Sequence, residues 1–268
     1  MKRGIYHILI ILQILLTGSC KKEIDMDYHD IEPITVIEGQ LSQSGGEVRI
    51  TMTTPMDEPM DTKLLTDATI VLSNLTTGEE EHLNPDDRGV FKSDRPGIAG
   101  NEYELQVNRG GKRYTSRCTM PDAPELLALE FNWIKMPYDH VAVLQVTFTE
   151  NAGETGECYW VRLYRNGEAY MWNLVTDIYA SDGIINDVFM TSRKDLDEED
   201  DATALRDGDI VSASVSPISR KMYDYLEAVS SDSNGPQLFE GDFCLGYFIA
   251  TSVVESSVIF HPDEIAIY

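Results

Sequence analysis

The sequence predicts a mainly β protein built from two β-rich domains, with one helix in the second. Alternation of apolar and polar residues recurs along the chain, whereas helical periodicity is scarce. Turn signals rich in glycine, asparagine and proline separate the alternating segments. The chain has 268 residues and a hydrophobic fraction of 42%, which suffices for a packed core and argues against wholesale disorder.

The alternating segments of the first half are short and closely spaced. Arg109-Gly110-Gly111 is the strongest hairpin signal among them, because glycine accepts a positive φ without steric cost. The predicted strands cover residues 33–41, 47–53, 68–75, 90–91, 101–108 and 112–119. We therefore predict an N-terminal immunoglobulin-like or transthyretin-like β-sandwich over residues 33–122.

Two prolines, Pro121 and Pro124, interrupt this pattern and predict a stiff connector. We place a domain boundary there and predict a second β-rich sandwich domain over residues 123–268. Its strands are expected at residues 125–134, 140–150, 158–164, 170–176, 209–215 and 243–254. The segment 158–164 alternates between two sets of side chains, with Tyr159, Val161 and Leu163 on one face and Cys158, Trp160, Arg162 and Tyr164 on the other.

The single predicted helix follows residue 216. Ser216 is a suitable N-cap, and Pro217 fits the first helical position. An apolar stripe then repeats with helical spacing through Ile218, Met222, Tyr225, Leu226 and Val229. We expect this helix to cover one end of the second sheet.

The first nineteen residues are typical of a secretory signal peptide, with Lys2 and Arg3 followed by an apolar stretch. That stretch is shorter than the roughly 20 residues needed to span a bilayer. Gly18 and Ser19 directly before Cys20 resemble a bacterial lipobox, which predicts acylation of Cys20 by fatty acids such as palmitate. The alternative is an ordinary cleaved signal followed by a chance cysteine.

Residues 20–32 are predicted to form a lipidated tether. The segment Lys21-Lys22-Glu23-Ile24-Asp25 loosely resembles the acidic surface-export signal of Bacteroidota lipoproteins, and a plain solvated tether is the alternative. We expect a protein that is lipid-anchored in the outer membrane, and exposed at the cell surface if the export signal is used.

The acidic composition excludes several partners. The formal charge is −25, and removal of Lys2 and Arg3 with the signal peptide changes it to −27. Such a chain repels the phosphates of nucleic acids and anionic lipid headgroups. We therefore expect no nucleic-acid partner, and a membrane link through lipid alone.

Three cysteines remain if Cys20 is lipidated: Cys118, Cys158 and Cys244. An exported protein can form disulfides, but three is an odd number. Cys158 and Cys244 lie in strand-like apolar segments and are the favoured pair, with buried thiols as the alternative. No Cys-x-x-Cys occurs, which excludes a zinc knuckle or a thioredoxin-like site by spacing.

The densest acidic segment runs from Asp195 to Asp209. An EF-hand calcium loop starting at Asp195 would need glycine at position 6 and glutamate at position 12, but these positions hold Asp200 and Arg206. A solvated loop is therefore the favoured interpretation, and calcium binding is the alternative. The histidines are not spaced as metal ligands, and we expect no metal site.

Motifs of catalysis and cofactor binding are missing from the sequence. It contains no Gly-x-Ser-x-Gly elbow, Walker loop or Gly-x-Gly-x-x-Gly. We expect no enzyme activity and no cofactor. The candidate ligand-binding residues are Trp133, Trp160 and Trp172, whose rings could stack on a glycan or line a peptide groove. Packing within the sheets is the alternative role for these rings.

Several segments, in this order, resemble the Bacteroidota outer-membrane lipoproteins described as a domain of unknown function, family 4249. They are Cys20-Lys21-Lys22-Glu23-Ile24-Asp25, Ile31-Glu32-Pro33, residues 36–41, 67–72 and 100–105, and Leu245-Gly246-Tyr247-Phe248-Ile249-Ala250-Thr251-Ser252. The resemblance implies an N-terminal β-sandwich, a second mostly-β domain and genes that often neighbour TonB-dependent receptors. It implies no catalytic residues.

The leading hypothesis is an outer-membrane lipoprotein accessory to a TonB-dependent nutrient-uptake system, binding substrate or docking on the transporter. The alternative is a cell-surface adhesin or fimbrial structural subunit. Pro262 in the last segment argues against donation of one long strand, as fimbrial assembly would need. A hydrolase with an unrecognised site is a third hypothesis.

Overall fold

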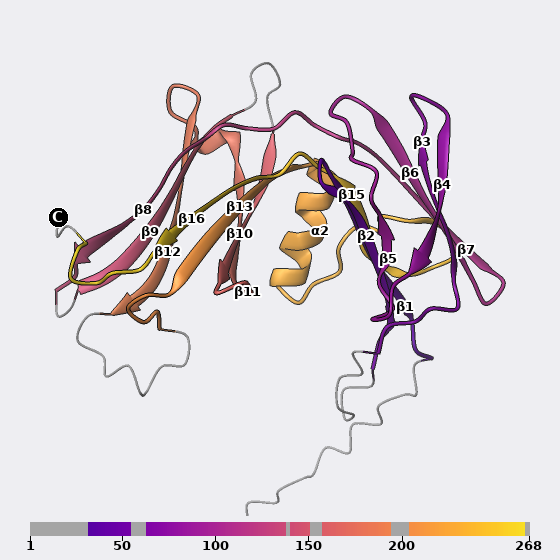
Figure 1. Ribbon diagram of the computed structural model, residues 1–268, viewed down its shortest axis with the longest axis horizontal. Helices are drawn as coiled ribbons and strands as arrows, with labels where there is room; N and C mark the ends of the chain where they lie inside the picture. The colour runs from indigo at the N-terminus through magenta and orange to yellow at the C-terminus, as the bar shows by residue number, and fades with distance from the viewer. Residues whose placement is uncertain (1–31, 55–62, 138–139, 151–156, 194–203, 266–268) are drawn as a thin grey trace, which may run out of the picture. The chain divides into compact units, whose positions relative to one another are not determined.

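The structure, a computed structural model, describes residues 32–54, 63–137, 140–150, 157–193 and 204–265. The predicted signal peptide and Cys20 lie outside the described residues. Residues Pro33–Tyr268 form one compact unit (Figure 1). The described part of the chain holds sixteen strands, one α-helix and one short 3-10 helix, which confirms the prediction of a mainly β fold. No helix in this part is both long and apolar enough to cross a membrane.

The N-terminal half forms a nine-stranded sheet with two strands contributed from late in the chain. Its order is β14-β7-β6-β3-β4-β5-β2-β1-β15. The sheet curves so that its strands enclose one apolar core. A Cβ atom added at Gly39 would lie 3.1 Å from the Leu105 side chain on the facing layer. The bounds are β1 (Thr35–Ser42), β2 (Gly45–Met52), β3 (Thr69–Asn74), β4 (Glu79–Pro85), β5 (Phe91–Ser93), β6 (Glu102–Arg109), β7 (Lys112–Thr119), β14 (Glu240–Gly241) and β15 (Leu245–Ala250).

The second part is a two-layer sandwich of three and four strands. The sheet orders are β12-β9-β8 and β11-β10-β13-β16. The two layers enclose a second core, in which the rings of Phe148 and Tyr159 lie 5.1 Å apart. The bounds are β8 (Leu126–Lys135), β9 (His140–Thr149), β10 (Cys158–Arg165), β11 (Glu168–Thr176), η1 (Asp177–Tyr179), β12 (Ile184–Arg193), β13 (Ile210–Ile218) and β16 (Val254–Ile259). Two facing sheets make this part a β-rich sandwich with one helix beside it, as predicted for the second half of the chain.

Strand β10 alternates as the sequence predicts. Tyr159, Val161 and Leu163 are fully buried between the layers. The side chains on the opposite face of β10 point away from the sandwich core, and part of this face packs against the helix. The outer face of the four-stranded sheet is therefore available to build a site.

The helix begins three residues later than predicted. Helix α2 spans Arg220–Ser230, and its N-cap is Ser219, whose hydroxyl accepts a hydrogen bond from Met222 N at 3.2 Å. Ser216 and Pro217 stay in β13, where Pro217 pairs opposite Tyr159. The predicted stripe is confirmed at Met222 and Leu226, which are buried, whereas Val229 is 52% exposed.

The strand prediction for residues 243–254 is wrong in one respect. Strand β15 pairs in parallel with β1, in register from Val36↔Leu245 to Leu41↔Ala250, and only β16 joins the second sandwich. Phe248 packs into the first core, and Ile249 packs beside Trp160 on the other side. The chain therefore crosses back to the first sheet before its last strand, while the predicted domain boundary between residues 122 and 123 stays a prediction.

Candidate functional site

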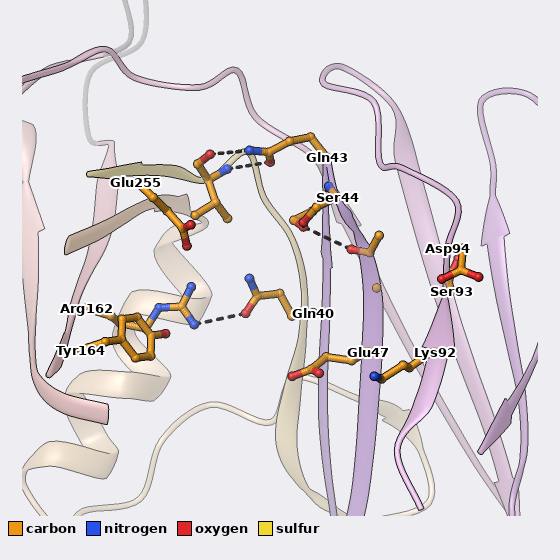
Figure 2. Close-up of a pocket in the computed structure, with 14 residues that line it drawn as sticks. Gln40, Gln43, Ser44, Glu47, Lys92, Ser93, Asp94, Arg162, Tyr164 and Glu255 are labelled. Carbon is orange, nitrogen blue, oxygen red and sulfur yellow. Dashed lines mark hydrogen bonds between the residues drawn. The ribbon is translucent and has the colours of Figure 1, made fainter. Parts of the chain in front are cut away.

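A polar pocket of about 740 Å³ opens between the first sheet and the outer face of the four-stranded sheet (Figure 2). One wall comes from β1, β2, β5 and their turns, and the other from β10 and the start of β16. Figure 2 shows Arg162, Tyr164 and Glu255 on the sandwich side and Gln40 and Glu47 on the side of the first sheet. The lining residues are Gln40, Ser42, Gln43, Ser44, Gly45, Gly46, Glu47, Lys92, Ser93, Asp94, Arg162, Tyr164, Val253 and Glu255.

Arg162 is the cation at the centre of the sandwich wall. Its Nη1 donates to Gln40 Oε1 at 3.2 Å, and its Nη2 donates to Ser216 Oγ at 3.2 Å. The guanidinium carbon lies 4.4 Å from the ring centre of Trp160, a cation–π distance. Within the described part of the chain, no carboxylate lies at ion-pair distance from Arg162. Neutral groups therefore hold this half-buried cation, and its direct contacts among the described residues include no carboxylate.

Strand register sets a row of side chains across the outer face. Arg162 pairs opposite Trp172 on one side and Ser214 on the other, and Ser214 pairs opposite Glu255. Directly opposed residues share a face of an antiparallel sheet. The row therefore runs from β11 across to β16 and consists of Trp172, Arg162, Ser214 and Glu255. Two of these residues, Arg162 and Glu255, line the pocket.

Four buried polar atoms on this face lack a hydrogen-bond partner among the described residues. They are Trp160 Nε1, Arg162 Nε, Thr176 Oγ1 and Ser214 Oγ. Ser214 is only 2% exposed and lies between Arg162 and Glu255 in the row. A buried polar group without a partner costs about 1–3 kcal/mol. Each such group therefore needs a reason other than stability.

The opposite wall carries charges that already have partners. Glu47 accepts from Arg49 at 3.0 Å, and Lys92 lies 3.4 Å from Asp86. Both are surface pairs, worth roughly 0–1 kcal/mol each. A ligand can therefore compete for Glu47 and Lys92 at little cost.

Two side-chain amides join the walls. Gln40 reaches Arg162, as described, and Gln43 pairs with the backbone of Val253 from the opposite half of the chain. Gln43 Nε2 donates to Val253 O, and Val253 N donates to Gln43 Oε1 at 2.9 Å. Thr251 Oγ1 also donates to Pro217 O at 2.7 Å. These bonds tie the β15–β16 connection to both walls, so the pocket is largely preformed.

The structure brings together two of the three predicted tryptophans. The rings of Trp160 and Trp172 lie 6.4 Å apart, edge to face, and Trp160 meets Tyr247 at 6.0 Å. Trp172 is 41% exposed and could contact a ligand. Trp133 lies elsewhere, in the second core, where its Nε1 donates to Pro262 O at 3.0 Å. Ligand binding by these rings stays a prediction, and for Trp133 the packing alternative describes its environment.

The three cysteines are not joined by disulfides in the described part of the chain. The favoured pairing of Cys158 with Cys244 is therefore wrong, and the alternative of buried thiols holds. Both residues are buried, in different apolar clusters. Burial raises the pKa of the Cys118 and Cys244 thiols to about 12, so they stay protonated and inert at neutral pH.

Much of the acidic segment, including Asp195, lies outside the described residues. Its last member, Asp209, is buried and bridges to Arg165 at 2.7 Å. Burial by itself would raise the pKa of Asp209, but hydrogen bonds from Arg206 N, Asn166 and Arg165 outweigh it and lower that pKa. Asp209 therefore serves the fold. Within the described residues, His, Cys, Asp and Glu side chains form no group of three able to hold a metal ion.

Sequence reasoning missed most of this pocket. Gln40 and Glu47 lie opposite each other on the β1–β2 hairpin, whereas Glu255 lies on β16 more than 200 residues later, and their grouping depends on the crossing of β15. A signal was present at Arg162, a charged residue in the middle of a strand whose other face is apolar. Such a side chain needs polar partners when it is half-buried.

Comparisons with known proteins identify a family but no function. A family model described as Domain of unknown function (DUF4249) matches residues 21–257. No curated protein matches the chain.

Among solved structures, a two-fibronectin type-III domain segment from chicken tenascin is 12% identical, covers 85% of this chain and 100% of that chain, and gives a TM-score of 0.25. A cytokine receptor complex is 13% identical, with coverage of 85% and 98% and a TM-score of 0.27. The FN1–FN3 domains of chicken CNTN1 are 16% identical, with coverage of 84% and 65% and a TM-score of 0.21. Because these TM-scores lie below 0.5, the fold assignment rests on the strand pairing of this chain.

Proposed function

The chain belongs to the family described as Domain of unknown function (DUF4249), and from its pocket we propose that it binds a small polar nutrient beside an outer-membrane transporter. It does so as a Bacteroidota lipoprotein anchored through Cys20. Its role is to hold the solute for uptake by a TonB-dependent receptor, without transforming it.

The observation that carries this proposal is the polar pocket between β1 and β10. Its volume of about 740 Å³ lies within the range of roughly 300–1,000 Å³ found for small-molecule sites. The walls present amides, hydroxyls and charges of both signs, and Tyr164 adds an aromatic ring. Such groups match a glycan or a peptide better than an apolar solute, whose burial would leave them without partners.

A preformed pocket suits transient capture. The bonds from Gln40 to Arg162 and from Gln43 to Val253 hold the walls together before any solute enters. A ligand then loses little free energy in ordering the protein. An accessory protein gains from this arrangement, because it must release the solute as well as bind it.

The membrane link rests on the sequence. Acyl chains on Cys20 contribute about 0.8 kcal/mol for each buried CH₂, and several chains hold a protein whose charge repels the bilayer. The location beside a transporter rests on the resemblance to lipoproteins whose genes neighbour TonB-dependent receptors.

The test is co-purification of the tagged full-length protein from outer membranes. We expect a TonB-dependent receptor to accompany it, and we expect the Cys20→Ala variant to leave the membrane fraction and lose the receptor. Purification of the tagged protein from outer membranes without any receptor would contradict the transporter role. A Cys20→Ala variant that stays in the membrane would contradict the lipid anchor.

A further inference from the structure

Resting on the proposed function, we propose that the pocket takes a short zwitterionic peptide, with its terminal carboxylate on Arg162 and its terminal ammonium on Glu255. Charge, register and the remaining hydrogen-bond donors of the pocket carry this assignment. It selects the peptide from the two nutrient classes, glycan and peptide, that the polar walls could accept.

Arg162 is the anion anchor. Its charge has no carboxylate partner among the described residues, whereas the pocket's other cation, Lys92, lies 3.4 Å from Asp86. Gln40, Ser216 and the Trp160 ring fix the guanidinium plane without neutralising it. A fixed guanidinium recognises a carboxylate through paired hydrogen bonds, which makes Arg162 the favoured position for a ligand carboxylate.

The rest of the pocket disfavours a purely anionic ligand. Glu47, Asp94 and Glu255 line it against the two cations Lys92 and Arg162. A phosphate or an acidic oligosaccharide would add like charge beside these carboxylates. A molecule that brings both a carboxylate and an ammonium matches the pocket at both ends.

Glu255 is the counterpart for the ammonium. It stands two strands from Arg162 in the same row, so their backbones are roughly 10 Å apart at the usual strand spacing. Figure 2 shows both side chains turned into the pocket. An extended peptide covers about 3.3–3.6 Å per residue, so two to three residues match this backbone separation.

Neutral groups line the path between the two charges. Gln40 Oε1 is committed to Arg162, which leaves its Nε2 to donate to a peptide carbonyl. Tyr164, the next outer-face residue on β10, offers its ring to a side chain of the ligand.

Calorimetry on the full-length protein, in a polyoxyethylene detergent that carries neither sugar nor charge, tests the assignment. The probes are trialanine, N-acetyl-trialanine, trialanine amide, maltotriose and tri-galacturonate. We expect trialanine to bind, and each blocked peptide to bind at least about tenfold more weakly. We expect the two sugars to give no measurable heat.

Two variants locate the ends of the peptide. Arg162→Gln should abolish the preference for trialanine over its amide, and Glu255→Gln should abolish the preference over the acetylated peptide. Glu227→Gln, on the exposed face of α2, is the matched control and should change neither preference. Because each variant is judged by a ratio of two ligands, a partial loss of folded protein does not imitate the result.

Several outcomes would overturn the inference. Equal affinity for free and amidated trialanine in the wild-type protein would do so, as would no heat with any peptide. Binding of maltotriose alone would also overturn it, while leaving the proposed capture of a polar nutrient standing. The co-purification experiment tests the transporter role independently of all these results.

Discussion

Gln40 Oε1 accepts a hydrogen bond from Arg162 Nη1 at 3.2 Å, which connects β1 to β10 across 122 positions of sequence. The same guanidinium donates to Ser216 and stacks on Trp160. A strand of the first sheet therefore orients the cation of the second sandwich, and the two halves build the pocket together.

Replacing Gln40 by methionine tests this orientation. Gln40→Met keeps the length of the side chain and removes the acceptor, so the guanidinium loses one of its two side-chain hydrogen bonds. We expect the affinity for trialanine to fall by about three- to tenfold and the free energy of unfolding by about 1 kcal/mol. Calorimetry and urea unfolding measure the two effects. An unchanged affinity would mean that Gln40 does not position Arg162.

Gly246 provides a test of the pairing between β15 and β1. Its φ is +102°, and a Cβ there would stand 1.9 Å from the carbonyl oxygen of Ile37. Gly246→Ala must displace β15, and we expect it to lower the free energy of unfolding by more than about 3 kcal/mol. Gly78→Ala is the control, because φ is +78° but no atom lies within 4 Å of the Cβ position. That variant should cost about 1 kcal/mol. Urea unfolding that gives equal costs would contradict the tight pairing.

We expect the loss of stability on replacing a tryptophan to depend on how deeply its ring is buried. Trp133 is 2% exposed and packs against Phe260, so Trp133→Ala should cost about 3–5 kcal/mol. Trp172→Ala removes a ring that is 41% exposed and should cost about 1 kcal/mol or less. Urea unfolding followed by far-ultraviolet circular dichroism compares them without relying on tryptophan emission. A larger loss at Trp172 would reverse this assignment.

We expect the burial of Asp187 to make the free energy of unfolding depend on pH. Burial raises the pKa of its carboxyl group, and hydrogen bonds from Asn173 and Val188 oppose that rise only in part. A raised pKa means that the folded state holds the proton more tightly than the unfolded state. Asp187 therefore favours folding most below its unfolded pKa of about 3.9, and this contribution is lost as the pH rises through the folded pKa.

The variant Asp187→Asn removes this titration. We expect it to be more stable than the wild-type protein by about 1 kcal/mol at pH 7, and we expect the difference to shrink towards pH 4. Urea unfolding across this range measures it, with Asp263→Asn as a control at an exposed aspartate. A difference that grows towards acid pH would have the wrong sign.

Sequence periodicity predicted the local structure well. The alternation in residues 158–164 gave the correct inner and outer faces of β10, because a strand with one buried face must place every second side chain in the core. The helix stripe located Met222 and Leu226 for a similar reason. The helix start was misplaced because Ser216 and Ser219 both suit an N-cap, and only the pairing of Pro217 opposite Tyr159 distinguishes them.

Long-range pairing could not be predicted in the same way. Residues 245–250 have the same strand pattern whichever sheet they join, so nothing local favours β1 over the second sandwich. The pocket depends on that choice, because the segment after β15 supplies Val253 and Glu255. The sequence predicted ligand binding at the tryptophans. The pocket in the structure is instead lined by polar side chains around Arg162.

A crystal structure of the full-length protein with trialanine, at a concentration that saturates the calorimetric titration, tests the central claim most directly. We predict that the peptide lies between the two walls, with its carboxylate about 3 Å from the Arg162 guanidinium and its ammonium facing Glu255. A peptide bound on another surface, or one whose carboxylate faces away from Arg162, would contradict the assignment.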